Sequence, residues 1–214
     1  MDFIKNPQTI EMKSMSIIAG MDREQDYSTP EGMVIRRMVH TTGDPEVARL
    51  AVVHPRAVAA GLMALGPGKC ILTDVRMVEA GISSRRLGQL GMNVKCAIDD
   101  PEVAAEASRR RETRAMVAMR RLAPYMDGHI VAIGNAPTAL FQVIEMIKAG
   151  MVHPALVVGT PVGFVGAAES KQVLEELSIP FITLRGTKGG SAVAAAAVNA
   201  LLYMDGSTGG NRNG

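Results

Sequence analysis

The 214-residue sequence has few aromatic side chains: they make up 3% of the residues, and tryptophan is absent. Methionine, in contrast, occurs 15 times. Because the thioether side chain is flexible and polarisable, methionine can fill the volume that aromatic rings fill elsewhere, and we expect most of these residues in the core. The same side chains can also form an adaptable apolar wall for a large, flat ligand.

Cysteine is scarce as well. Cys70 and Cys96 show neither C-x-x-C spacing nor an adjacent histidine, and each lies in a short apolar run. We therefore expect two buried free thiols and no redox pair. No histidines or cysteines are spaced as metal ligands, so the sequence predicts no metal site.

The sequence also lacks an excess of one charge and lacks long apolar runs. Its 23 basic and 21 acidic side chains give a net charge of +2 without a polybasic tract, so nucleic acid is not an expected partner. No apolar run approaches the roughly 20 residues that span a bilayer, and the first ten residues lack the basic start and apolar segment of a signal peptide. These features predict a cytoplasmic protein with no membrane partner.

The chain is long enough for one continuous core, and we expect a single domain over residues 1–214. Residues 1–65 are expected to be helical, with an amphipathic segment over 9–20 and further helices over 28–40 and 44–65. Ser28 and Glu31 have the spacing of a capping box, and Gly43 is an expected helix end. Residues 205–214 contain no apolar side chain and are expected to form a mobile tail.

Residues 66–204 instead alternate short runs rich in β-branched residues with helical patterns. The expected strands cover residues 70–73, 93–98, 129–133, 155–158 and 181–184. One long helix is expected over residues 101–123. This alternation predicts right-handed crossovers, and therefore a three-layer α/β/α fold with a mainly parallel sheet of about five strands.

Ligands bind such sheets beyond the carboxyl ends of the strands. Four loops are expected there, over residues 73–86, 133–140, 159–171 and 185–192. Their glycine spacing matches neither the dinucleotide nor the P-loop pattern, so no nucleotide cofactor is predicted. The cations Lys171, Arg185 and Lys188, with exposed backbone N–H groups, suit carboxylates or phosphates. The alternative is that the glycines serve tight turns and the cations are solvated.

His40 is the candidate catalytic residue, because it lies in the last turn of a predicted helix with Arg37 one turn earlier. A helix C-terminus stabilises imidazolium and a nearby arginine opposes it, a balance that suits a general acid. A capping or packing role is the alternative. His54 and His153 precede prolines and His129 begins a strand, so we expect turn and boundary residues there.

Four motifs occur together: RMVH at 37–40, IGNAPTAL at 133–140, PVGFVGAAESK at 161–171 and RG-x-x-GGSA at 185–192. With them, the sequence resembles the precorrin-8X (cobalt-precorrin-8) methylmutase family from about residue 6 to residue 202. The resemblance implies an isomerase that moves a methyl group within ring C of a tetrapyrrole, giving hydrogenobyrinic or cobyrinic acid in cobalamin biosynthesis. It implies no external cofactor.

The resemblance also implies roles for individual residues. His40 corresponds to the histidine of the family's R-M-V-H motif, the acid that protonates the macrocycle. The implied ligand contacts are Ser14, Arg37, Ser83, Arg114, Asn135, Gly163 and Lys171. A homodimer with the ligand near the subunit interface is implied as well. The resemblance leaves open whether the substrate carries cobalt.

Two other functions remain as alternatives at this point. One is a corrinoid-binding carrier that hands its ligand on without catalysis, against which the presence of His40 argues. The other is a nucleotide-dependent oxidoreductase built on the same kind of sheet. That function lacks its phosphate-binding fingerprint in this sequence.

Overall fold

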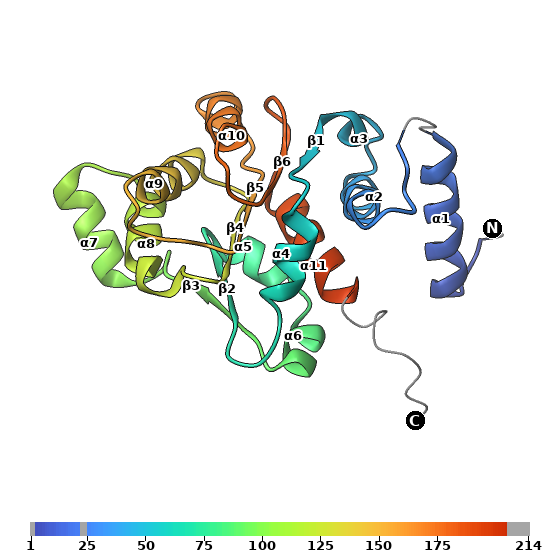
Figure 1. Cartoon of the computed structure of the whole chain (residues 1–214), viewed down its shortest axis with the longest axis horizontal. Helices are drawn as coiled ribbons and strands as arrows, with labels where there is room; N and C mark the ends of the chain where they lie inside the picture. The colour runs from blue at the N-terminus through green and yellow to red at the C-terminus, as the bar shows by residue number, and fades with distance from the viewer. Residues whose placement is uncertain (1–2, 22–24, 205–214) are drawn as a thin grey trace.

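A six-stranded sheet forms the centre of the computed structural model, which describes residues 3–21 and 25–204 (Figure 1). The strands are β1 (Ala51–Val53), β2 (Cys70–Thr73), β3 (Asn93–Cys96), β4 (Ile130–Ile133), β5 (Leu156–Gly159) and β6 (Phe181–Leu184). They lie in the order β1-β6-β5-β4-β2-β3. All neighbours are parallel except β1 and β6, so the predicted mainly parallel sheet is confirmed with one additional strand.

The additional strand lies in a segment that we expected to be helical. Between α3 (Glu46–Leu50) and α4 (Ala57–Met63), residues 51–53 pair antiparallel with β6. Val52 and Val53 are β-branched and precede His54–Pro55, a sequence that favours extended backbone. The helical prediction for these three residues was wrong because pairing with the free edge of β6 decides their conformation.

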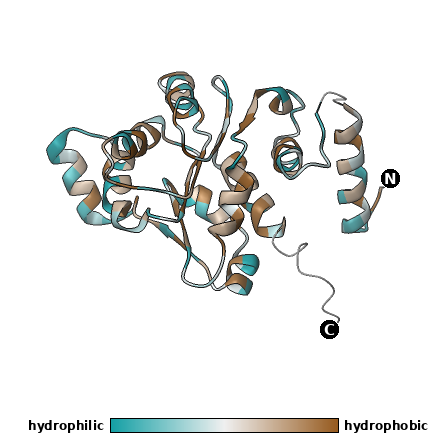
Figure 2. Ribbon diagram, in the orientation of Figure 1, coloured by the Kyte–Doolittle hydropathy of each residue, from teal (hydrophilic) through white to brown (hydrophobic). Residues whose placement is uncertain are grey.

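Helices cover both faces of the sheet, which confirms the three-layer architecture (Figure 1). The helices α4, α5 (Arg76–Gly81) and α11 (Ser191–Met204) pack on one face, with contacts to β2, β3, β4 and β5. The other face carries α8 (Arg114–Leu122), α9 (Pro137–Lys148) and α10 (Ala167–Glu175). Every residue of β2, β4, β5 and β6 is buried, as expected for strands covered on both sides. Figure 2, coloured by hydropathy, shows the central strands as largely hydrophobic.

Two local predictions between these elements were wrong. The helix expected over residues 101–123 is broken into α7 (Pro101–Arg110) and α8, because Arg111 adopts a left-handed φ of 57° and Thr113 caps α8 by accepting a hydrogen bond from the Met116 N–H. The loop expected over 73–86 contains α5 and the start of α6 (Ser84–Leu90). A short 3-10 helix (Ala123–Tyr125) follows α8.

The N-terminal helices form a layer outside the sheet domain (Figure 1). The helix α2 (Pro30–Thr42) packs against α11, and α1 (Pro7–Met21) packs against α2. Within α1 the buried residue is Ile18, whereas Ile10, Ile17 and Met21 are exposed. The first helix is therefore held by a narrow contact.

The cap of α2 differs from the expected capping box. Its N-cap is Thr29, whose hydroxyl accepts a hydrogen bond from the Gly32 N–H at 3.0 Å. Ser28 instead hydrogen-bonds Asp26 through both its backbone N–H and its hydroxyl. The expected end of the helix is confirmed, since Gly43 has a left-handed φ of 65°.

The methionines divide between core and surface. The buried set is Met38, Met92, Met119, Met126, Met146 and Met204, and the exposed set is Met12, Met21, Met63, Met77 and Met151. Met15, Met33 and Met116 are half-buried, and Met33 packs against the core. Among the described residues, fewer than half of the methionines are fully buried, so the core accounts for fewer of them than expected. Both thiols are free, with Cys70 buried and Cys96 half-buried, and burial raises the pKa of each.

Candidate active site

His40 lies at the end of α2 and faces a small apolar cavity between α1 and α2. Its Nδ1 is 2.8 Å from the hydroxyl oxygen of Ser14 on α1. The cavity has a volume of about 300 Å³. Its lining consists of Ile4, Ile10, Lys13, Ser14, Ile17, Ile18, Met21, Val39, His40, Gly43 and Pro45. The structure thus brings together two of the predicted site residues, Ser14 and His40.

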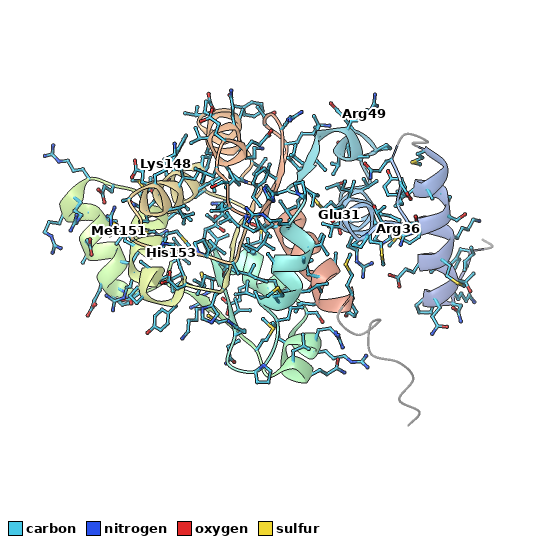
Figure 3. All side chains as sticks on the ribbon, viewed as in Figure 1. Glu31, Arg36, Arg49, Lys148, Met151 and His153 are labelled. Atoms are coloured by element: carbon cyan, nitrogen blue, oxygen red, sulfur yellow. The ribbon has the colours of Figure 1, made fainter. Side chains whose placement is uncertain are left out.

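Arg37, one turn before His40, lies beside a second and larger hollow. Its guanidinium donates to Glu11 Oε1 at 2.8 Å and lies 5.9 Å from the centre of the Tyr203 ring. This groove, of about 720 Å³, separates α1 from α2 and the end of α11. Arg36 also lines it, on the side of α2 that faces α1 (Figure 3). Its walls carry four methionines, Met12, Met15, Met33 and Met204.

Ser83 borders the same groove through Tyr203. It is the N-cap of α6, where its hydroxyl accepts a hydrogen bond from the Arg86 N–H at 3.3 Å, and the same oxygen lies 3.3 Å from the Tyr203 hydroxyl. The Arg86 guanidinium lies 5.6 Å from the centre of the Tyr203 ring. Tyr203 is therefore flanked by two arginines, Arg37 and Arg86.

Asn135 lies at the carboxyl edge of the sheet, in the loop between β4 and α9. Its side chain is exposed, but its backbone N–H donates to Asp74 Oδ2 at 2.9 Å. The same carboxylate also accepts from the N–H groups of Gly134 and Ala136, at 3.1 and 2.8 Å. Asp74 itself is fully buried, and this burial raises its pKa. It therefore fixes the loop that presents Asn135.

Gly163 lies in the loop after β5 and takes a φ of 146°, which favours glycine. Its N–H donates to the Thr187 carbonyl at 3.1 Å and so ties this loop to the loop after β6. The next two side chains, Phe164 and Val165, are 94% and 88% exposed. The loop is anchored at Gly163 and presents an apolar tip to solvent.

Lys171 on α10 is fully buried. A lysine that binds a ligand carboxylate from solvent would instead be exposed. Lys171 Nζ donates to the Lys188 carbonyl at 2.6 Å, and burial lowers its pKa to about 8. Arg114, by comparison, is exposed at the first position of α8. The hydroxyls of Thr113 and Thr138 lie 2.9 Å apart and bring the start of α8 to the start of α9, close to the Asn135 loop.

The predicted site residues therefore form two groups. Ser14, Arg37, Ser83 and His40 lie around α1, α2 and the end of α11. The other four, Arg114, Asn135, Gly163 and Lys171, lie along the carboxyl edge of the sheet. The sequence reasoning missed Asp74 and Tyr203. An aspartate directly after the apolar strand CILT was the available signal for Asp74, whereas nothing in the sequence distinguished Tyr203.

The remaining polar candidates lie apart from these groups. His153 is exposed on the side of the molecule away from α2 (Figure 3). His54 accepts a hydrogen bond from the Arg56 N–H within the turn before α4, as expected for a turn residue. Within residues 3–21 and 25–204, no three His, Cys, Asp or Glu side chains gather as metal ligands, and no helix is long and apolar enough to cross a bilayer.

Comparison with known proteins identifies the family. Residues 9–204 match the family model described as precorrin-8X methylmutase. The chain belongs to the precorrin-8X methylmutase family. It is 44% identical to the cobalt-precorrin-8 methylmutase of Priestia megaterium, over 92% of this chain and 88% of that protein. It is 41% identical to the precorrin-8X methylmutase of Pseudomonas aeruginosa, over 94% and 97%.

The fold agrees with this assignment. The crystal structure of precorrin-8X methylmutase from Thermus thermophilus superposes with a TM-score of 0.84 at 39% identity, covering 94% of this chain and 98% of that one. Like the other precorrin-8X methylmutases, the chain is an isomerase of the methylmutase type, with a role in cobalamin biosynthesis.

Proposed function

We propose that the chain moves a methyl group within ring C of precorrin-8X or cobalt-precorrin-8, giving hydrogenobyrinic or cobyrinic acid, with His40 as the general acid. The observation that carries this proposal is the position of His40. Its imidazole borders an apolar cavity, and its Nδ1 lies 2.8 Å from the Ser14 hydroxyl. Nε2 is then the nitrogen that faces a ligand.

In the proposed reaction, His40 gives one proton to the macrocycle and takes it back when the product forms. In the imidazolium form, the Nδ1–H group donates to Ser14 and the Nε2–H group donates to the macrocycle. Protonation makes the conjugated ring system electron-poor. The methyl group then leaves one carbon of ring C with its bonding electron pair and bonds to the neighbouring carbon. The proton returns to Nε2 as the product forms, so no external cofactor is consumed.

The size of the cavity limits how the substrate enters. A volume of about 300 Å³ is at the lower end of the range for ligand sites and suits one edge of a tetrapyrrole. We propose that the ring C edge enters this cavity. The adjacent groove of about 720 Å³, with its methionines and with Arg36 and Arg37, suits the apolar face and the carboxylates of the same disc.

We propose that the loops at the carboxyl ends of the strands bind the carboxylate side chains at the rim of the tetrapyrrole. Arg114 and Asn135 are exposed there, and Gly163 lets the loop backbone come close to a ligand. Lys171 is also proposed to serve this region. In the present arrangement its ammonium supports the loop after β6 through the Lys188 carbonyl, and it must leave that carbonyl to reach a carboxylate.

A homodimer is proposed because one copy leaves α1 poorly covered. Ile10, Met12, Ile17 and Met21 are exposed on this helix although they also line the His40 cavity or the groove, and exposed apolar side chains of this kind mark an interaction site. A second copy could also bring the two groups of site residues to one ligand. Light scattering after size exclusion should give twice the chain mass, whereas a monomer at micromolar concentration would contradict this part. A cytoplasmic location stays a prediction.

The proposed reaction is tested by mixing the purified chain with precorrin-8X and, separately, with cobalt-precorrin-8. The absorption spectrum should change to that of hydrogenobyrinic or cobyrinic acid, and the faster conversion identifies the preferred form. Cobalt, if present, arrives with the substrate. Binding of both substrates without conversion would favour the carrier alternative and contradict the proposal.

A further inference from the structure

Lys188, in the loop between β6 and α11, connects two parts of the molecule that are far apart in sequence. Its backbone carbonyl accepts the hydrogen bond from Lys171 Nζ. Its own Nζ donates to Asp44 Oδ2 at 2.5 Å and to Glu46 Oε2 at 2.6 Å. Asp44 lies in the short connection after α2, the helix that ends just after His40, and Glu46 is the first residue of α3. One side chain therefore links the carboxyl edge of the sheet to the end of the His40 helix.

The backbone from which this side chain starts is held firmly. Gly189 has a φ of 158°, and a Cβ atom there would lie 2.3 Å from the Thr160 carbonyl oxygen, so the two loops are in direct backbone contact. The Gly190 N–H donates to the same carbonyl at 2.8 Å, and the Gly163 N–H donates to the Thr187 carbonyl at 3.1 Å. The Lys188 side chain thus extends from a fixed position.

The segment that receives the Lys188 ammonium forms a wall of the His40 cavity. Gly43 and Pro45, on either side of Asp44, line the cavity together with His40. The Asp44 carboxylate also accepts a hydrogen bond from the Glu46 N–H at 3.0 Å. Lys188 lowers the pKa of Asp44, chiefly through its side-chain hydrogen bond, and the two carboxylates raise the pKa of Lys188. Both shifts favour the charged forms of Lys188 and Asp44, and so favour the ion pair between them.

We propose that Lys188 is a positioning residue for His40, whose ammonium clamps Asp44 and Glu46 and so holds the cavity wall at the end of α2. Lys188 touches no ligand in this proposal, which rests on the proposed role of His40. Exposed ion pairs contribute little to folding stability, so the effect of the clamp falls on geometry. Displacing a catalytic group by about 1 Å can lower a rate by up to about 10²-fold.

The test compares three variants with the parent in single-turnover conversion of saturating substrate. Lys188→Met removes the ammonium but keeps most of the length of the side chain, and it should lower the rate about 10-fold, with affinity for hydrogenobyrinic acid within about 3-fold of the parent. Lys188→Arg should restore most of the rate, because a guanidinium reaches both carboxylates. Lys148→Met is the matched control, since it makes the same change at an exposed lysine in the last turn of α9, away from α2 (Figure 3). A parent-like rate for Lys188→Met, or an equal loss in Lys148→Met, overturns the proposal.

A mutant cycle covers the possibility that Lys188→Met folds poorly. The double variant Asp44→Asn with Glu46→Gln removes the same clamp from the other side and should show the same rate loss. Adding Lys188→Met to it should cause no further loss, because one interaction cannot be lost twice. Losses that multiply would mean that the residues act independently and would overturn the clamp.

One measurement separates this proposal from the proposed reaction. The ring nitrogen chemical shifts of His40, recorded by NMR without substrate, should change in Lys188→Met and stay constant in Lys148→Met. If the parent converts neither substrate while these shifts change as expected, the reaction assignment fails and the clamp stands. Unchanged shifts in Lys188→Met, in an enzyme that turns over, overturn the clamp alone.

Discussion

Two buried or half-buried polar groups show how single residues shape this molecule. Asp74 places a carboxylate among three backbone N–H groups at the end of β2, and Ser14 holds one nitrogen of the His40 ring. In both cases protein atoms, and not water, satisfy the hydrogen-bonding capacity of the polar group. Their substitution should therefore have separable consequences, for stability in the first case and for rate in the second.

Asp74→Asn should destabilise the chain by about 2–4 kcal/mol. An amide replaces one acceptor oxygen with an NH₂ donor, which would face a backbone N–H at the fully buried end of β2. Urea unfolding of parent and variant measures the difference. The exposed Asp127→Asn is the matched control and should change the free energy of unfolding by about 0.5 kcal/mol or less. A similar loss in both variants would contradict the role assigned to Asp74.

Ser14→Ala should lower the single-turnover rate about 10-fold with little change in corrinoid affinity, because the imidazole loses the hydroxyl that orients it. Ser108→Ala, an exposed position on α7, provides the same chemical change away from the site. Absorbance-monitored conversion gives the rate and calorimetry gives the affinity. A rate equal to that of the parent would mean that the ring is oriented by other contacts.

For the helices, a few local contacts decide where an element begins or ends. The start of α2 is an example, since Thr29 caps the helix and Ser28 does not. Thr29→Ala should cost about 1 kcal/mol of the free energy of unfolding, which is typical of a lost N-cap. Ser28→Ala should cost clearly less. Chemical denaturation of both variants tests this order, and the reverse order would contradict it.

Lys171 on α10 links helix burial to pH. Its pKa is lowered to about 8 in the fold, against 10.5 for an exposed lysine, because burial disfavours the charged form. Between these values the unfolded chain binds the proton and the native chain does not. The free energy of unfolding should therefore rise with pH over this window, by up to about 3 kcal/mol.

The comparison of Lys171→Met with the parent isolates this contribution. Unfolding measured at pH 7.5 and at pH 10 should show the parent gaining stability relative to the variant over that interval. Other titrating groups affect both proteins alike, so the difference between them reports Lys171. An equal pH dependence in both proteins would show that the ammonium is not desolvated in the native state.

The sequence predicted most strands because each is a short apolar run, and β2 and β6 have the predicted bounds. It could not predict β1, since Ala51–Val53 becomes a strand only by pairing with β6. The break at Arg111 was missed for a related reason. The residues around it have good helix propensity, whereas the Thr113 cap and the left-handed arginine are set by how α7 and α8 pack.

In the whole molecule, the sheet and the N-terminal helices form separate layers (Figure 1). The predicted site residues are divided between these layers. Motifs in the sequence predicted which residues to examine and the family to which they belong. They could not predict that Ser14 would reach His40 across 26 residues or that Lys171 would be fully buried. Both facts depend on packing between distant elements, which local patterns do not encode.

In the proposed reaction, His40 supplies the proton for the methyl shift. The most direct test is single-turnover conversion by His40→Asn, with affinity for hydrogenobyrinic acid measured separately. An amide can replace a hydrogen bond but cannot supply a proton at neutral pH. The variant should bind the product within a few-fold of the parent and convert substrate about 10² to 10⁴-fold more slowly. Conversion within a few-fold of the parent rate would show that the proton comes from another group and that His40 is not the general acid.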